Sequence, residues 1–107
     1  MDAMETFLAY AGRYDTNDAK IHLKIVHTQA VDAVMERLSE ALGLDGRMCG
    51  LAHLCAVYHD IGRFEQLRRY DTFLDHLSVD HAQLGCEVLR SGEFLDGLPE
   101  KLSLIHI

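Results

Sequence analysis

The pair His59-Asp60 is the place in this chain where residue types and spacing most clearly allow chemistry. It ends the stretch 51–60, which is otherwise apolar on almost all sides, so the periodicity predicts a buried helix. A carboxylate and an imidazole are unfavourable in such surroundings unless something pairs with them. A divalent cation binds an anionic oxygen and a neutral imidazole together, and the pair therefore indicates a metal site.

Two more histidines occupy helix faces that apolar spacing predicts to point inward. His27 belongs to a helix expected at about 18–42, and His81 begins the inner face of a helix expected at about 79–90. The two inward stripes otherwise consist of Leu23, Val31, Val34, Leu38 and Leu42, and of Leu84, Gly85, Val88 and Leu89. Metal sites in helical bundles are built from side chains on facing helices, whereas any one of these histidines alone could be an ordinary core residue.

Helical periodicity dominates the rest of the chain and predicts an all-α helical bundle. The other expected elements are helices at about 3–11 and 46–60, an ordered loop with a short helical turn at 62–77, and a turn or short helix at 93–101. Asp2, Asp45 and Ser78 are the expected N-caps, and Gly43 is expected to end the helix at 18–42.

The three cysteines are odd in number and form no C-x-x-C pair, which argues against a disulfide framework and against a thiolate zinc site. Cys55 and Cys86 lie within apolar helical patterns, and we expect both to be small core residues.

Charge and length narrow the class of protein. The 107 residues fit one domain or part of one, and the net charge of −7 argues against duplex nucleic acid as a partner. A small phosphorylated molecule stays compatible, because a bound metal ion can supply local positive charge. No apolar run approaches the roughly 18 residues of a membrane span, and the N-terminus lacks the features of a signal peptide. We therefore expect a cytoplasmic protein without a membrane partner.

Four segments carry a resemblance to a known family. They are Asp18-Ala19-Lys20-Ile21, His27-Thr28, His59-Asp60-Ile61-Gly62-Arg63-Phe64-Glu65-Gln66 and Ser78-Val79-Asp80-His81-Ala82-Gln83-Leu84-Gly85. A histidine on one helix, His-Asp at the end of a later one and Ile-Gly after it resemble the HD-domain superfamily of metal-dependent phosphohydrolases. The residues of these four segments are similar to those of one bacterial branch of uncharacterised HD-domain proteins.

The resemblance implies roles for particular residues. His27, His59 and Asp60 would bind a divalent metal ion (Mn, Mg, Fe or Zn), and in members with two ions the aspartate placed like Asp60 bridges them. His81 would help to hold the second ion or contact the substrate phosphate, which places it on the rim of the pocket. Asp60, His81 and Arg63 are thus the candidate catalytic residues.

Arginines near the pair are candidates for binding the substrate. Arg63 follows Asp60 closely, and a guanidinium suits bidentate phosphate binding, although an ordinary surface ion pair is an equal alternative. Arg63 and His81 are therefore the candidate substrate-binding residues. Arg68 and Arg69 are explained better as solvated surface charges than as substrate-binding residues.

The chain departs from the family pattern on its C-terminal side. The pattern ends with an aspartate on a later helix, usually after another histidine, and no aspartate after Asp60 stands far enough along to match. The segment Leu102-Ser103-Leu104-Ile105-His106-Ile107 resembles a translated transposon-end adapter from sequencing libraries, with a short apolar tail as the alternative. We interpret 1–101 as a partial HD domain, its N-terminal part only, and 102–107 as a non-native tail.

The expected function is that of a metal-dependent phosphohydrolase acting on a nucleotide or another small phosphate ester, here as an incomplete fragment with little or no activity. The first alternative is a non-catalytic metal- or ligand-binding regulatory HD module, and the second is a structural bundle with core histidines. The oligomeric state is left open. Uncovered parts of the apolar stripes should favour association.

Overall fold

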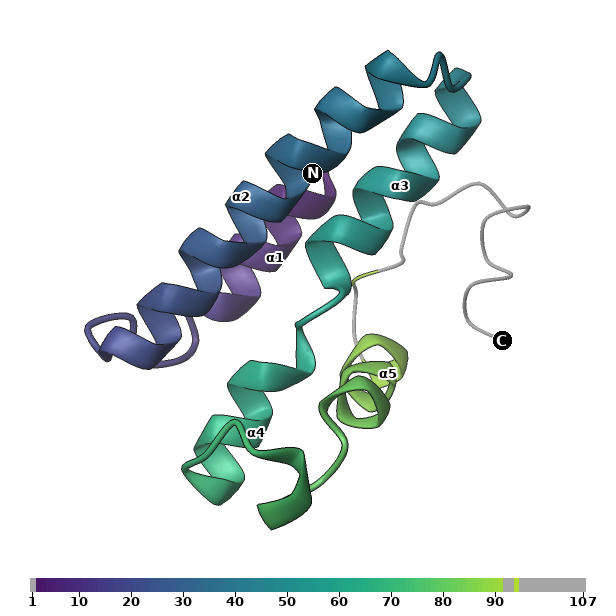
Figure 1. Cartoon of the computed structure of the whole chain (residues 1–107). Coiled ribbons are helices and arrows are strands. Elements are labelled where there is room, and N and C mark those ends of the chain that lie inside the picture. Colours follow the sequence, from purple (N-terminus) through teal and green to yellow (C-terminus); the bar gives the residue numbers. More distant parts are fainter. Residues whose placement is uncertain (1, 92–93, 95–107) are drawn as a thin grey trace.

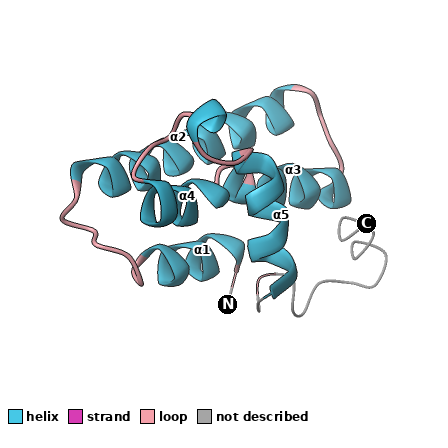
Figure 2. Cartoon of the chain, turned by 90° about the horizontal axis from the view of Figure 1, so that it is seen from below, coloured by secondary structure: helices cyan, strands magenta, loops and turns pink. Residues whose placement is uncertain are grey.

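A computed structural model describes residues 2–91 and Phe94 (Figure 1). In that part of the chain the elements are α1 (Ala3–Ala11), α2 (Ala19–Ala41), α3 (Gly46–Tyr58), α4 (Gly62–Tyr70), the short 3-10 helix η1 (Asp75–Leu77) and α5 (His81–Ser91). The described residues contain no strand (Figure 2), which confirms the predicted all-α class. None of their helices is long and apolar enough to span a membrane.

Aspartates cap the first three helices, as expected for Asp2 and Asp45. Asp2 forms a capping box with Glu5 at α1, and the Asp45 side chain accepts a hydrogen bond from the backbone N–H of Met48 at α3. Asp18 caps α2 through the N–H of Lys20. Gly43, with φ of +65°, follows the end of α2, where a residue without a Cβ is favoured.

The helices form two packed groups that share a core. α2 packs along α3, α1 lies against both, and α4 packs on α5 (Figure 1). The core lies where α1, the end of α3 and α4 meet, and Phe7, Val57, Ile61 and Phe64 are almost completely buried there. The rings of Phe7 and Phe64 meet edge to face with centroids 5.6 Å apart. This core holds the chain segment after α3 in place, and that segment carries the His-Asp pair.

The predicted inward stripe of α2 is wrong. Its exposed members are Leu23, His27, Val34, Leu38 and Leu42. The buried residues of α2 are instead Ile21, Thr28 and Ser39. This helix carries apolar residues on more than one side, so spacing alone does not choose the buried face, and packing against α3 decides it.

Three local predictions after α3 also need correction. The segment 62–77 contains the helix α4 and not mainly a loop, because Phe64 and Leu67 pack into the core one helical turn apart. Asp80 caps α5 by accepting from the N–H of Ala82, whereas Ser78 uses its hydroxyl to accept from Gln66. Helix α3 ends at Tyr58, before the pair.

The cysteine prediction is wrong as well. Cys55 and Cys86 are exposed, each on the outer side of a helix whose opposite side is buried. All three cysteines are free thiols. The expected turn at 93–101 and the tail 102–107 lie outside the described residues, apart from Phe94.

Gly62 allows α4 and α5 to touch. A Cβ on Gly62 would lie 2.2 Å from the carbonyl oxygen of His81 and 2.6 Å from the backbone nitrogen of Gly85. No side chain fits between these backbones, so glycine at position 62 is required for the contact. The contact brings the first turn of α5, and with it His81, next to Asp60 at the end of α3.

Candidate metal centre

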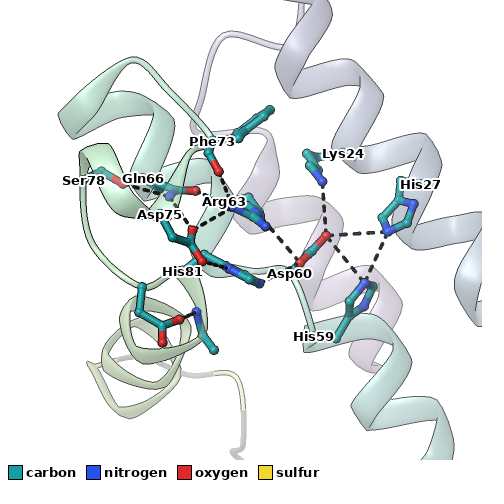
Figure 3. Close-up of polar contacts among 12 residues, drawn as sticks. Lys24, His27, His59, Asp60, Arg63, Gln66, Phe73, Asp75, Ser78 and His81 are labelled. Carbon is teal, nitrogen blue, oxygen red and sulfur yellow. Dashed lines mark hydrogen bonds and ion pairs between the residues drawn. The ribbon is translucent and has the colours of Figure 1, made fainter.

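Three elements bring their polar side chains to Asp60, as Figure 3 shows. Asp60 lies in the short link between α3 and α4 and is only 7% exposed, whereas the neighbouring His59 is exposed. His27 reaches the same place from the middle of α2, and His81 reaches it from the start of α5. The carboxylate of Asp60 is therefore the common centre of this group.

One oxygen of Asp60 faces the imidazoles of His27 in α2 and of His59, which directly follows α3. Its Oδ2 lies 3.6 Å from Nε2 of His27 and 3.5 Å from Nε2 of His59, and the two Nε2 atoms are 3.3 Å apart. The predicted meeting of His27, His59 and Asp60 is thus present in the structure. His27, contrary to expectation, meets the others from an exposed helix face. Their role as ligands stays a prediction.

The spacing of these three atoms fits a metal ion. Nitrogen and oxygen ligands at about 2.0–2.2 Å from a tetrahedral ion lie about 3.3–3.6 Å from one another. The orientation of His59 fits as well, because its Nδ1–H donates to the carbonyl oxygen of Ala56 at 2.7 Å. That bond leaves Nε2 as the ring nitrogen with a free lone pair, turned toward Asp60. The three residues present can therefore hold a divalent cation.

The other oxygen of Asp60 faces α4 and α5. Oδ1 lies 3.4 Å from Nε2 of His81 and 3.8 Å from Nε of Arg63. His81 thus lies on the side of the carboxylate away from His27 and His59, and its expected place at the rim of the pocket stays a prediction. A carboxylate with histidines on both oxygens has the arrangement expected of a bridging ligand.

Lys24 belongs to the site, although it is not among the residues predicted from the sequence. Its Nζ lies 3.3 Å from Oδ2 of Asp60, from a position one helical turn before His27. Burial alone would raise the pKa of Asp60, but Lys24, His59 and Arg63 outweigh it and hold the pKa below its ordinary value. The spacing Lys-x-x-His on one helix is the signal that could have identified Lys24.

Asp75 is a second site residue that the sequence prediction missed, because it fails to match the last aspartate of the family pattern. Its Oδ1 accepts from Nε2 of Gln66 at 2.9 Å and from Nη1 of Arg63 at 3.1 Å, and its Oδ2 accepts from Nδ1–H of His81 at 2.9 Å. The hydrogen bond from His81 is the main reason that the pKa of Asp75 falls to about 2. Gln66, completely buried, ties this network to the protein.

Arg63 is more constrained than a phosphate-binding arginine on a surface. Its Nη1 donates to the carbonyl oxygen of Phe73 at 2.7 Å as well as to Asp75 and Gln66. Its Nε is buried without a hydrogen-bond acceptor and faces Asp60. The guanidinium thus supplies positive charge to the site, while Nη1 has a structural role.

The remaining candidates lie elsewhere. Arg68 and Arg69 are exposed and pair with Glu65, in agreement with the expectation of solvated charge. Nδ1–H of His53 in α3 donates to Oδ1 of Asp32 in α2, 2.7 Å away, and His53 takes no part in the contacts of Asp60.

Comparison with known proteins adds no relative: no protein-family model, curated protein or solved structure matches this chain. The site must therefore be interpreted from its own geometry.

Proposed function

We propose that this chain is the metal-binding part of an HD-type metal-dependent phosphohydrolase that acts on a nucleotide or another small phosphate ester. One observation carries the proposal: a nearly buried carboxylate, Asp60, has the Nε2 atoms of His27 and His59 within 3.5–3.6 Å of one oxygen. Two imidazoles and a carboxylate are a common ligand set for catalytic divalent ions.

The residues around the carboxylate suit a phosphate ester. A divalent ion held by His27, His59 and Asp60 would polarise a phosphoryl oxygen and lower the pKa of a bound water. Lys24 and Arg63 add two fixed positive charges beside Asp60, which favours an anionic substrate in a chain that is otherwise acidic. His81 supplies a ring nitrogen on the opposite oxygen of Asp60, where a proton can be accepted or donated.

Metal binding is the first test. Titration of the chain with Mn²⁺ or Zn²⁺ in a calorimeter should show binding that His59→Ala weakens by more than about 100-fold. Loss of a ligand should reduce the affinity more than loss of a residue that only orients a ligand, which costs up to about 100-fold. His76→Ala, which removes an exposed histidine outside the site, is the matched control and should bind as the unchanged chain does. Equal metal affinity in both variants would contradict the proposal and favour the alternative of a structural helical bundle with ordinary histidines.

Activity is the second test. The chain is assayed against nucleoside phosphates and simple phosphate esters with added Mn²⁺, Mg²⁺ or Fe²⁺, and again with a chelator. The proposal predicts hydrolysis that is weak in this chain, because the last aspartate of the family pattern is absent from it, but that requires the metal and is lost in Asp60→Asn. Metal binding without hydrolysis of any ester would favour the regulatory HD module instead.

A further inference from the structure

Asp75 connects the arginine and glutamine side chains of α4 with the first residue of α5. It does so with both of its oxygens: Oδ1 accepts from Arg63 and Gln66, and Oδ2 accepts from His81 (Figure 3). Although the Asp75 side chain is 40% exposed, its donors are not, because Gln66 is buried and Arg63 is held by the carbonyl oxygen of Phe73. The orientation of the carboxylate is therefore set from the protein side.

This orientation determines which nitrogen of His81 carries the proton. A carboxylate can only accept, so the contact of 2.9 Å between Oδ2 of Asp75 and Nδ1 of His81 places the hydrogen on Nδ1. In the neutral ring Nε2 then presents its lone pair to Oδ1 of Asp60, 3.4 Å away. Two acceptors that face each other at this distance need a cation or a water molecule between them.

We propose that Asp75 is a positioning residue, which fixes His81 in the Nδ1–H form so that its Nε2 acts as an acceptor beside Asp60. The second half of this inference rests on the proposed function, because the group that Nε2 meets is then a metal ion or a water bound to one. Carboxylates that hold a histidine in this way are common around metal sites, where they set ring orientation and basicity.

A second metal site made of Asp75, Asp80 and His81 explains the geometry less well. Their ligand atoms do lie within 4.8 Å of one another. However, Asp80 accepts from the N–H of Ala82 as the cap of α5, and Asp75 already has donors from Arg63 and Gln66. Both carboxylates are thus satisfied by the protein, and hydrogen bonding accounts for their closeness.

Replacement of Asp75 by asparagine separates positioning from a merely structural role. Arg63 and Gln66 both donate to the Oδ1 position, so the carbonyl oxygen of the asparagine must take that place. Its NH₂ group then occupies the Oδ2 position and donates to Nδ1 of His81. The shape and the hydrogen bonds of the network survive, but the proton of His81 must move to Nε2, which can no longer accept.

The proton position is measured directly by long-range ¹H–¹⁵N correlation NMR of the histidine rings, in the metal-free 107-residue chain at pH 8. We expect His81 in the unchanged chain to be protonated at Nδ1 alone and in Asp75→Asn at Nε2 alone. Asp71→Asn is the matched control, because it makes the same charge change at an exposed residue of the same segment and should leave the His81 signals unchanged. Its left-handed backbone, with φ of 53°, also accepts asparagine well.

An Nε2–H or doubly protonated His81 in the unchanged chain would overturn the inference without any variant. So would an Nδ1–H ring in a folded Asp75→Asn chain. These results do not depend on metal binding, so they stand even if the proposed phosphohydrolase function fails.

Metal titration tests the second half. We expect Asp75→Asn to weaken Mn²⁺ binding by about 10- to 100-fold, as changes to the outer partners of ligating histidines do, with Asp71→Asn close to the unchanged chain. Asp75→Glu, which keeps a carboxylate, should restore part of the affinity. Unchanged Mn²⁺ affinity in Asp75→Asn despite a moved proton would show that Nε2 of His81 does not face the ion, and would overturn this half alone.

Discussion

Asp60 shows how a nearly buried carboxylate stays ionised in this protein. It is 7% exposed, and burial opposes its charge, yet the nearby cations lower its pKa. Lys24 is the nearest of them and contacts the same oxygen that faces His27 and His59. Its ammonium and a divalent ion would thus compete for Oδ2.

We therefore predict that Lys24→Met raises the pKa of Asp60 and tightens binding of Mn²⁺. With the ammonium gone, burial is opposed only by the remaining cations, and the ion no longer meets a like charge. Removing a unit charge at this distance should raise the affinity for Mn²⁺ by at least about fivefold, the value for fully solvated charges, because the pair is mostly buried. Carboxyl ¹³C titration and calorimetry measure the two effects, with the exposed Lys20→Met as control. Weaker Mn²⁺ binding in Lys24→Met would show that Lys24 assists the site.

At the scale of elements, the link from α3 through α4 to α5 decides the geometry of the site. α3 ends at Tyr58, so that His59 and Asp60 leave the helix axis just before α4 begins at Gly62. The backbone contact between Gly62 and the start of α5 then fixes how far His81 lies from Asp60.

We predict that Gly62→Ala destabilises the fold by about 1–3 kcal/mol, because its Cβ would overlap backbone atoms that cannot move aside as a side chain could. Gly50→Ala is the matched control in α3: nothing lies within 4 Å of its Cβ, and alanine favours a helix there. Urea unfolding followed by circular dichroism compares the two. A Gly62→Ala chain as stable as Gly50→Ala would contradict the close approach of α4 and α5.

Glu65 ties α4 to the turn that follows α1 through an ionic and hydrogen-bonded cluster. Its carboxylate pairs with Arg68 and Arg69 and accepts from the hydroxyl of Tyr14 at 2.7 Å. The hydrogen bond from Arg68 is the main cause that lowers its pKa to about 2.

Because the pKa of Glu65 is lower in the folded chain than in the unfolded one, its stabilisation is present above about pH 4.3 and is lost as pH falls toward 2. We predict that Glu65→Gln reduces the free energy of unfolding by about 1 kcal/mol at pH 7, since both arginines are exposed and screened. The difference should shrink at pH 2–3. Urea unfolding at both pH values measures it, with the exposed Glu40→Gln as control; an equal difference at both would contradict the lowered pKa.

At the scale of the whole molecule, one side of α2 leaves apolar side chains in water. Leu23, Val26, Val34, Leu38 and Leu42 expose between 47% and 71% of their surface. Successive members are three, eight, four and four residues apart, close to whole numbers of helical turns, so they form a stripe along one face of the helix.

We predict that the 107-residue chain associates with increasing concentration and that Val34→Thr combined with Leu38→Gln reduces this association. Both changes are nearly isosteric and neutral, so the charge of the chain is unaffected. Leu74→Gln combined with Leu77→Gln replaces equally exposed leucines elsewhere and is the control. Sedimentation velocity at several concentrations measures the effect. Equal association in both double variants would show that the α2 stripe does not cause it.

Local patterns in the sequence are enough to predict α1, α2, α3 and α5 and the histidines that meet at Asp60. Helix formation follows from spacing and capping within a few residues, so Asp2, Asp45 and Gly43 could be placed correctly. The chemistry of histidine and aspartate likewise belongs to the residues themselves, and so the pair His59-Asp60 indicates a metal ion from its residue types alone.

Only the tertiary structure decided which faces are buried and what surrounds the carboxylate. The buried side of α2 depends on α3, a partner that spacing within α2 does not describe, and so the predicted stripe was wrong. The sequence did not predict Lys24, Gln66 and Asp75 as site residues for the same reason. Each of them contacts a residue 9 to 36 positions away along the chain. Such contacts depend on how helices cross, here on Gly62, which lets α4 and α5 touch, and not on any local pattern.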